Sequence, residues 1–394
     1  MKLFLNECGI VCALGETHPE IKRRLLRDAD SGVAPTDAWS PGRVLPLGRV
    51  ETALPDSEAL PLGQRSRNNQ LALAALNQIR PALEAAVARY GAARVGVVVG
   101  TSTSGISVTE NALRALGAKG ALPDDFHYAQ QEMGSPAAML ARELGVAGPA
   151  YVHSSACSSS AKAMASAARL IRMGLCDAVL TGGVDTLCAF TVAGFGALES
   201  VSADRCNPLS ANRNGINIGE GAALFLMSAE PAAVALCGWG ESSDGHHMSA
   251  PDPAGGGARI AIAQALARAG IGAGEIDYIN LHGTATLQND AMESRVVADM
   301  FGPKVAVSST KPFTGHALGA AAALEAALCW LAMQDDNPHG ALPPQLWDGV
   351  ADPALPALDI VAPGRALGRP LRYALSNSFA FGGSNAALVL GRVR

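Results

Sequence analysis

Short apolar runs alternate along the chain with longer stretches in which apolar residues recur every three or four positions. The short runs have the length of strands, and several are apolar throughout, as in strands that helices cover on both faces. In the first part of the chain they predict strands at Leu3–Val11, Arg94–Gly100, Asp177–Thr181 and Ala222–Met227. The longer stretches predict helices at Pro19–Arg27, Gly105–Ala115 and Ser135–Leu144, and a helix from a Ser66 cap to about Ala86.

The same alternation begins again after Pro231, so we divide the chain into residues 1–230 and 231–394. Alternating strands and helices favour an α/β fold with mainly parallel, helix-covered sheets. Residues 30–62 are rich in Pro, Gly and Asp and are predicted to be irregular. The second part predicts strands at Ala235–Glu241, Ile276–Leu281, Val305–Ser308, Tyr373–Ser376 and Ala386–Leu390, and helices at Ala258–Arg268, Asp290–Met300 and Ala317–Met333.

Composition narrows the class of protein. The 394 residues are 49% hydrophobic and 16% charged, and the formal net charge is −5. No block of basic residues favours nucleic-acid binding, and no run of about 18 apolar residues predicts a membrane span. The eight cysteines are scattered without a CxxC pair, which disfavours a zinc site and indicates reduced thiols in a cytoplasmic protein.

The candidate chemistry begins at Cys157, where a predicted strand turns into a helix. The unpaired N–H groups of a helix start lower a thiol pKa, so we expect a nucleophile, although a small buried cysteine is the plainer interpretation. His282 and His316 lie at two further junctions between predicted strands, loops and helices. A cysteine with histidines is typical of covalent acyl chemistry.

Six blocks of sequence, in order, resemble the β-ketoacyl-acyl-carrier-protein synthases of the thiolase superfamily, and the resemblance spans nearly the whole chain. It implies the thiolase fold, with two pseudo-repeated βαβαβαββ halves in an α-β-α-β-α layered sandwich. The blocks are ACSSSAKA around Cys157, NRNGINIGEGAA (212–223), SDGHHMSAPDP (243–253), HGTATLQNDAMES (282–294), SSTKPFTGHALGAA (308–321) and NSFAFGGSNA (377–386).

The resemblance implies a decarboxylative Claisen condensation. Cys157 would hold the acyl chain, and His282 and His316 would assist decarboxylation of a malonyl-carrier protein. The resemblance implies three further residues for catalysis. Lys311 would tune the charge of the site, and Glu325 would be its buried partner. Phe381 would stabilise the oxyanion through its backbone N–H and would also form part of a gate. The resemblance implies substrate-binding roles for Thr284, Thr286, Ser249, Phe379, Asp244 and His247.

It also implies an acyl carrier protein as partner, whose phosphopantetheine carries the substrates, and no other cofactor or metal. Arg65, Arg67 and Arg205 are candidates for contact with the acidic carrier. The chain departs from the common pattern at Lys162, where many relatives carry His, and at Asn207 and Ser210, which replace an expected Arg and Asp. We expect a dimer, either of two copies or with a ketosynthase-like chain-length partner.

Two other activities fit parts of the pattern. A thiolase would have a second catalytic cysteine near the C-terminus, and none follows Cys329. A non-elongating, chain-length-determining subunit would keep the fold but lack the nucleophile, and Cys157 argues against it. Pro312 and the SSSAK run after Cys157 look more like synthases of aryl-polyene or other specialised polyene pathways than those of primary fatty-acid synthesis.

Overall fold

The computed structural model describes residues 1–393. Most of its strands are buried apolar runs, as the pattern of the sequence predicts. The strands are β1 (Phe4–Cys12), β2 (Val33–Thr36), β3 (Leu45–Gly48), β4 (Val95–Gly100), β5 (Ala150–His153), β6 (Ala178–Asp185), β7 (Gly221–Ser228), β8 (Val234–Ser243), β9 (Tyr278–Asn280), β10 (Ala306–Ser308), β11 (Asp359–Ile360), β12 (Tyr373–Ala380) and β13 (Ser384–Arg392).

Helices follow most of these strands and range from single turns to a helix of 24 residues. They are α1 (His18–Lys22, continued by a π-helical turn at Arg23–Asp28), α2 (Arg67–Tyr90), α3 (Ile106–Lys119), α4 (Ser135–Leu144), α5 (Ser159–Arg172), α6 (Ala189–Ala197), α7 (Gly256–Ala269), α8 (Leu287–Phe301), α9 (Lys311–Thr314) and α10 (Ala321–Ala332). None of the helices in residues 1–393 combines the length and apolarity that crossing a bilayer demands.

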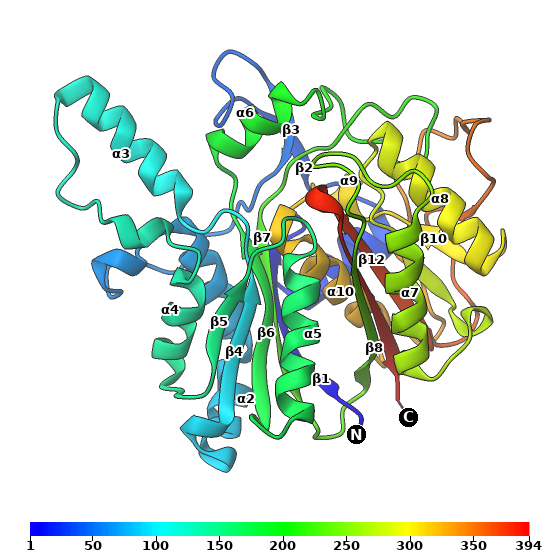
Figure 1. Ribbon diagram of the computed structural model, residues 1–394, viewed down its shortest axis with the longest axis horizontal. Coiled ribbons are helices and arrows are strands. Elements are labelled where there is room, and N and C mark those ends of the chain that lie inside the picture. The colour runs from blue at the N-terminus through cyan, green and yellow to red at the C-terminus, as the bar shows by residue number, and fades with distance from the viewer. Residues whose placement is uncertain (394) are drawn as a thin grey trace.

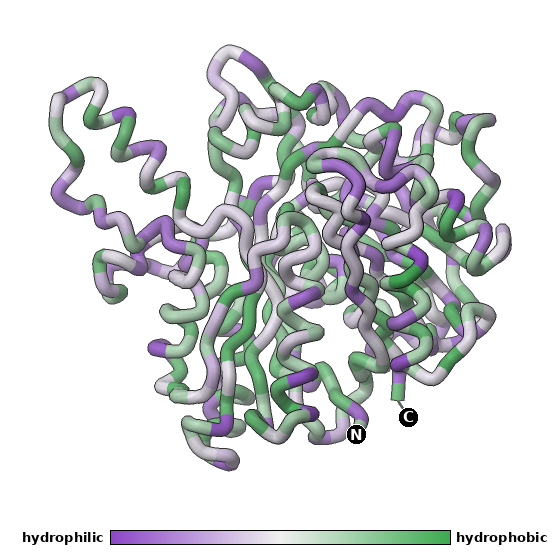
Figure 2. Tube along the Cα trace, in the orientation of Figure 1, coloured by the Kyte–Doolittle hydropathy of each residue, from purple (hydrophilic) through white to green (hydrophobic). Residues whose placement is uncertain are grey.

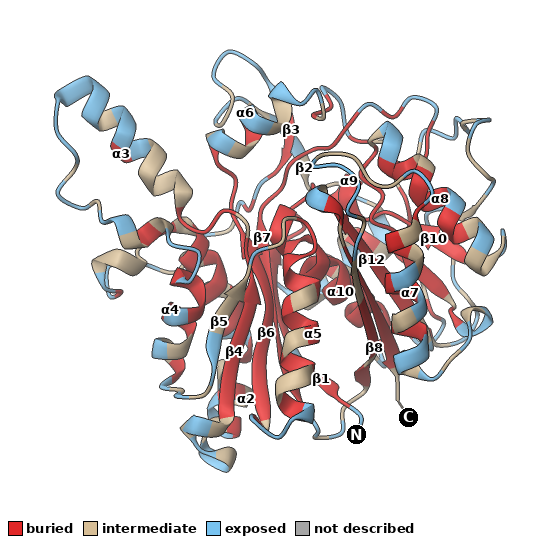
Figure 3. Ribbon diagram, in the orientation of Figure 1, coloured by how far each residue is buried: buried red, intermediate tan, exposed pale blue. Residues whose placement is uncertain are grey.

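The elements form layers (Figure 1). Helices α5 and α10 lie at the centre and contact strands of both halves of the chain: α5 packs on β4, β6 and β13, and α10 on β7 and β12. Helices α2 and α4 cover the outer face of the first set of strands, and α7 covers β8 and β13. The strands between these layers are the most hydrophobic and most buried part of the molecule (Figures 2 and 3), whereas α3 extends outward and is largely exposed.

All strands of residues 1–393 except β2 and β3 join into one sheet, whose order is β11-β10-β9-β12-β13-β8-β1-β7-β6-β4-β5. Parallel pairs join β4 to β5 and β6, and β9 to β10 and β12. Antiparallel pairs join β6 to β7, β1 to β7, β12 to β13 and β8 to β13. The predicted mainly parallel sheet is therefore wrong, because strands such as β12 and β13 follow each other across one tight turn and must run in opposite directions.

Some predictions of single helices and loops are confirmed by the structure, and others are wrong. Helix α4 begins and ends where predicted, and the Ser66 hydroxyl caps α2 by accepting the Asn69 N–H. The predicted irregular segment 30–62 is wrong in part, because β2 and β3 pair there as a two-stranded ribbon. Leu45 and Leu47 of β3 are buried, and the packing of these two side chains outweighs the weak propensity of their Pro- and Gly-rich surroundings.

Candidate active site

The nucleophile candidate lies on a strained turn between β5 and α5. Ala156 has a φ of 51°, a left-handed conformation that a residue with a Cβ rarely adopts. Hydrogen bonds among the surrounding serines hold the turn: the Ser159 N–H bonds to the Ala156 carbonyl at 3.1 Å, and the Ser155 N–H to the Ser159 hydroxyl at 2.9 Å. The turn aims Cys157, whose exposed fraction is 5%, at the ends of the strands from the other half of the chain.

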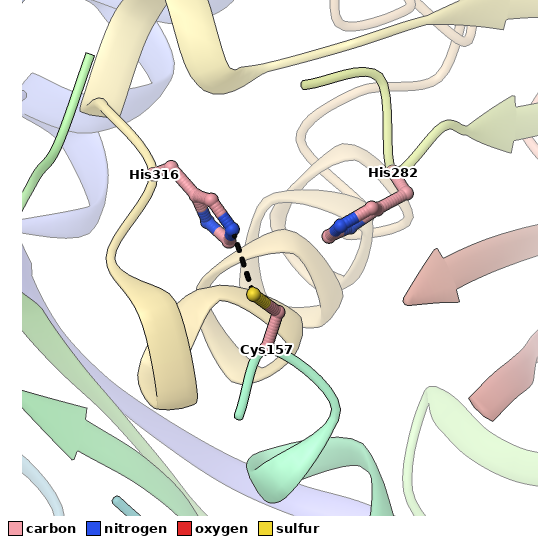
Figure 4. Close-up of side chains that lie close together, drawn as sticks. All are labelled: Cys157, His282 and His316. Carbon is pink, nitrogen blue, oxygen red and sulfur yellow. Dashed lines mark hydrogen bonds between the residues drawn. The ribbon is translucent and has the colours of Figure 1, made fainter. Parts of the chain in front are cut away.

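Two histidines from the second half of the chain meet this thiol. His282 lies two residues after the end of β9, and His316 is held by backbone bonds to the Asn217 carbonyl and the Gly219 N–H, at 2.6 and 2.9 Å. The His316 Nε2 lies 3.0 Å from the Cys157 Sγ (Figure 4). The two imidazole rings meet edge to face, with centroids 5.4 Å apart. The structure thus brings together three residues that are far apart in the sequence.

Lys311 fixes the proton position on His282. Its ammonium contacts the His282 carbonyl and one oxygen of Glu325, and lies 3.5 Å from the His282 Nδ1. An ammonium is a donor only, so this contact favours the His282 tautomer in which Nδ1 accepts and the ring proton lies on Nε2. The His316 Nδ1 has no hydrogen-bond partner within residues 1–393, so both of its neutral tautomers are accessible.

Burial keeps the reacting groups uncharged. It lowers the pKa of both His282 and His316 well below their ordinary value, and the nearby Lys311 lowers them further. It also raises the pKa of the Cys157 thiol to about 12, partly offset by Lys311 and by the Phe381 N–H. The predicted lowering of this pKa is therefore wrong, because burial outweighs the helix start, which lies two residues further on at Ser159. The thiol needs a base, and the His316 Nε2 is the group within reach.

The thiol and the two imidazoles also offer the ligand types that bind zinc, and their ligand atoms all lie within 4.8 Å of one another. However, the Nε2 of His282 carries the proton that Lys311 enforces, so its lone pair is not free for a metal. The arrangement suits proton transfer and hydrogen bonding to an oxygen better than it suits metal binding.

A cavity of about 50 Å³ lies above the thiol. Five of the predicted substrate or gate residues line it, and sequence reasoning did not single out seven further lining residues. Ligand pockets usually measure about 300–1,000 Å³, so this space admits a thioester arm only after side chains move. The predicted five are Thr284, Thr286, Ser249, Phe379 and Phe381, and the seven are Phe195, Ser200, Ile216, Pro251, Gln288, Asn289 and Ala380.

Two predicted substrate residues lie outside that cavity. The Asp244 N–H bonds to the Gly383 carbonyl at 2.8 Å, and the Asp244 carboxylate accepts from the Asn385 amide at 2.7 Å. Asp244 therefore holds residues 381–384, which we call the gate loop. His247 is exposed and accepts the Ser249 N–H. Asp244 thus lies in a loop that faces the gate, as the resemblance implies, and contact of either residue with substrate stays a prediction.

Glu293 is predicted from the sequence to be structural, and it supports the turn that carries His282. Its buried carboxylate accepts the main-chain N–H groups of His282 and Gly283 at 2.8 and 2.7 Å, so it holds the turn that presents the imidazole. Burial raises its pKa to about 7, against the lowering effect of these hydrogen bonds. Glu293 lies eleven residues after His282 in the sequence. This spacing indicates a contact between the two residues only when the helix that carries Glu293 is known to fold back towards His282.

The three predicted carrier-protein contacts differ in accessibility. Arg67 forms a two-point ion pair with the fully buried Glu220, so its assignment is corrected to a structural one. Arg65 donates to the Leu60 and Glu58 carbonyls at 2.8 and 2.7 Å. Arg205 alone is exposed and forms no ion pair within residues 1–393. It lies between residues 200 and 216, which both line the cavity.

Comparison with known families and structures agrees with this geometry. The model of the beta-ketoacyl synthase N-terminal domain matches residues 9–232, and that of the C-terminal domain matches residues 233–346. The chain therefore belongs to the beta-ketoacyl synthase family. It is 33% identical to nodulation protein E of Rhizobium sp. (strain N33), over 100% of this chain and 99% of that protein. It is 37% identical to 3-oxoacyl-[acyl-carrier-protein] synthase 2 of Rhizobium meliloti (strain 1021), over 62% of this chain and 61% of that protein.

Solved structures identify the fold as the thiolase fold of ketosynthases. The ketosynthase ApeO, solved in complex with its chain length factor ApeC from Xenorhabdus doucetiae, superposes with a TM-score of 0.92 at 44% identity, over 100% of this chain and 98% of that one. A beta-ketoacyl synthase from Burkholderia phymatum STM815 gives 0.87 at 28% identity, with full coverage of both chains. The protein is thus an acyltransferase that forms carbon–carbon bonds by decarboxylative Claisen condensation, in fatty-acid or polyketide-like biosynthesis.

Proposed function

We propose that Cys157 receives the growing acyl chain from an acyl carrier protein and that His316 is the base for this step. The thiol attacks the thioester carbonyl while its proton passes to the His316 Nε2, 3.0 Å away. The tetrahedral intermediate then collapses, the acyl group stays on Cys157, and the proton passes on to the leaving phosphopantetheine thiolate. This proton transfer is needed because burial holds the thiol pKa near 12.

The second step uses both imidazoles as donors. A malonyl thioester loses CO₂, and the electron pair of the broken carbon–carbon bond forms an enolate whose oxygen needs hydrogen bonds. The His282 Nε2–H is held ready by Lys311, and His316 supplies the second donor in its Nε2–H tautomer. Two fixed donors at a developing oxyanion are each worth about 10²–10³ in rate. The freedom of the His316 tautomer suits its two successive roles.

The enolate carbon then attacks the acyl thioester on Cys157. The N–H groups of Cys157 and Phe381 stabilise the new oxyanion, and collapse releases the free thiolate and a chain longer by two carbons. The Phe381 N–H lowers the pKa of the Cys157 thiol, an effect that opposes burial and supports this role. The reaction as written needs no cofactor beyond the phosphopantetheine of the carrier protein.

The test of this assignment uses two substitutions at Cys157. Cys157→Ala, given acyl- and malonyl-carrier protein, loses condensation because no residue can hold the acyl chain; persistent condensation would sink the assignment. Cys157→Gln loses condensation too, but retains malonyl decarboxylation, because His282 and His316 are intact. Mass spectrometry of Cys157 after incubation with carriers bearing saturated or conjugated acyl groups identifies the preferred chain.

We also propose a ketosynthase-like partner subunit and a specialised polyene product. Support comes from the solved neighbours, two of which are ketosynthases described with chain length factors, and from the SSSAK run and Pro312. Analytical ultracentrifugation of the purified chain separates the alternatives. A stable, condensation-active dimer of this chain alone would refute the need for a different partner.

Arg205 is proposed as a carrier-docking residue because it is exposed beside the cavity and unpaired within residues 1–393. Arg205→Glu should raise KM for malonyl-carrier protein severalfold and leave decarboxylation of a small malonyl thioester unchanged. Equal effects on both substrates would contradict a docking role.

A further inference from the structure

Lys162 is a half-buried cation without a counter-ion. It lies on α5 five residues after Cys157, and it forms no ion pair within residues 1–393. Burial, and after it the charge of Arg169, lower the pKa of Lys162, and Arg169 itself pairs with Glu241. The ammonium instead donates to the hydroxyl of Ser384, at 2.5 Å. A long flexible cation loses side-chain entropy in such a position. The hydrogen bond to Ser384 is the interaction that offsets this loss.

This contact belongs to a chain of hydroxyl groups. An ammonium only donates, so the Ser384 oxygen accepts from Lys162. The Ser158 hydroxyl donates to the Ser155 carbonyl at 2.9 Å, which leaves its oxygen to accept the Ser384 proton across 2.9 Å. The Ser158 and Ser155 hydroxyl oxygens also lie 3.1 Å apart. Lys162 is therefore connected through Ser384 and Ser158 to the turn that carries Cys157.

The chain joins the two segments that meet at the nucleophile. Ser155 and Ser158 flank Cys157, and Ser384 ends the gate loop at the first residue of β13. Gly382 and Gly383 both have positive φ values, which glycine adopts readily, and Gly382 is exposed.

On its other side the gate loop bonds to loop 244–248. The Gly382 N–H bonds to the Met248 carbonyl at 2.8 Å, and the Asp244 N–H bonds to the Gly383 carbonyl at 2.8 Å. The Asn385 amide also donates to the Gly383 carbonyl at 3.3 Å, and the Phe381 ring packs against Phe195. These contacts do not reach the turn that carries the thiol, whereas the chain from Lys162 through Ser384 to Ser158 does.

We propose that Lys162 is a positioning residue for the condensation: through Ser384 and Ser158 it holds the gate loop so that the Phe381 N–H faces the carbonyl carried on Cys157. The proposal rests on the proposed function, since it assumes that this N–H stabilises the oxyanion. Loss of one oxyanion donor costs about 10²–10³ in rate, so a donor that is loosened rather than lost should cost about tenfold.

The test compares Lys162→Met with a matched control, Arg169→Met. Methionine keeps much of the aliphatic chain of lysine but removes the ammonium. Arg169 is the control because it lies seven residues, about two turns, further along α5 and forms no hydrogen bond with Ser384. Lys162→Met should lower kcat of condensation about tenfold, with KM for the acyl-carrier protein within twofold of the original. Arg169→Met should leave both constants unchanged. Urea unfolding of both variants measures any general loss of stability.

Three further variants distinguish positioning from mere packing. Lys162→Arg should restore most of kcat, because guanidinium is also only a donor. Ser384→Ala should reproduce the defect, and the double variant should be no slower than either single one, because both changes break the same chain.

A kcat within twofold of the original in Lys162→Met, no recovery in Lys162→Arg, or multiplied defects in the double variant would each overturn the proposal. Failure of the unmodified protein to load an acyl group on Cys157 would instead overturn the proposed function, so the two failures are distinguishable.

Discussion

The ion pair between Arg67 and Glu220 gives a sharp test of which arginines bind the carrier protein. Glu220 is fully buried and also accepts the N–H groups of Val50 and Leu187, each at 3.1 Å. Arg67 is its only cation within residues 1–393, and it bonds both carboxylate oxygens, at 2.5 and 3.0 Å. Arg67→Met would leave that carboxylate buried and without a counter-charge.

The cost follows from this geometry. Removing one member of a buried ion pair typically destabilises a protein by about 3–5 kcal/mol, because the remaining charge is desolvated and unpaired. The Arg67 side chain is 32% exposed, so water partly replaces it and we expect the lower end, about 3 kcal/mol. That is a large share of the roughly 5–15 kcal/mol by which folded proteins are stable.

Two assays on two variants separate structural and docking roles. Urea unfolding should show the loss for Arg67→Met and less than about 0.5 kcal/mol for the exposed Arg205→Met. Steady-state kinetics should show the reverse: KM for malonyl-carrier protein rises for Arg205→Met and stays within twofold for folded Arg67→Met. If Arg67→Met unfolds at the original urea concentration and raises KM, the structural interpretation is refuted.

Three other outcomes test the site. His282→Asn should lower malonyl decarboxylation about 10²–10³-fold, measured as CO₂ release, since it removes one enolate donor. Because burial raises the pKa of Glu293 from 4.5 to about 7, the folded protein binds this proton more tightly than the unfolded chain. Stability from this group should therefore be present below pH 4.5 and fall by about 3 kcal/mol as pH rises through 7, a slope that urea unfolding of Glu293→Gln should lack. Gly100→Ala places a Cβ 2.3 Å from the Ser160 nitrogen, so we expect a loss of about 1–3 kcal/mol, measured as a lower Tm, and slower acylation of Cys157.

The parts of the fold that the sequence predicts well are those set by local periodicity. The run at 95–100 and the helix at 135–144 carry their period and their end signals within a few residues. Ser66 can cap α2 because its partner is only three residues away. Such signals need no knowledge of the rest of the molecule.

Contacts between distant segments are what the sequence does not show. Arg67 and Glu220 are 153 residues apart, and each looks like an ordinary exposed charge in its own segment. The antiparallel pairs of the sheet depend on which strands become neighbours, and short apolar runs do not encode that choice. The shifted pKa of Cys157 arises in the same way, because burial within the folded chain outweighs the local effect of a helix start.

These long-range effects explain why a condensing site with so little charge works. The thiol and both imidazoles are buried and neutral, so a proton moves between Cys157 and His316 without placing a lasting charge in the core. The charges that remain, on Lys311 and Glu325, are paired beside the site and orient His282 rather than react. An oxyanion that appears in such surroundings meets preformed donors and little competing water, which strengthens each hydrogen bond to it. Burial therefore makes the thiol a weaker acid, but it makes the enolate and the tetrahedral oxyanion easier to form.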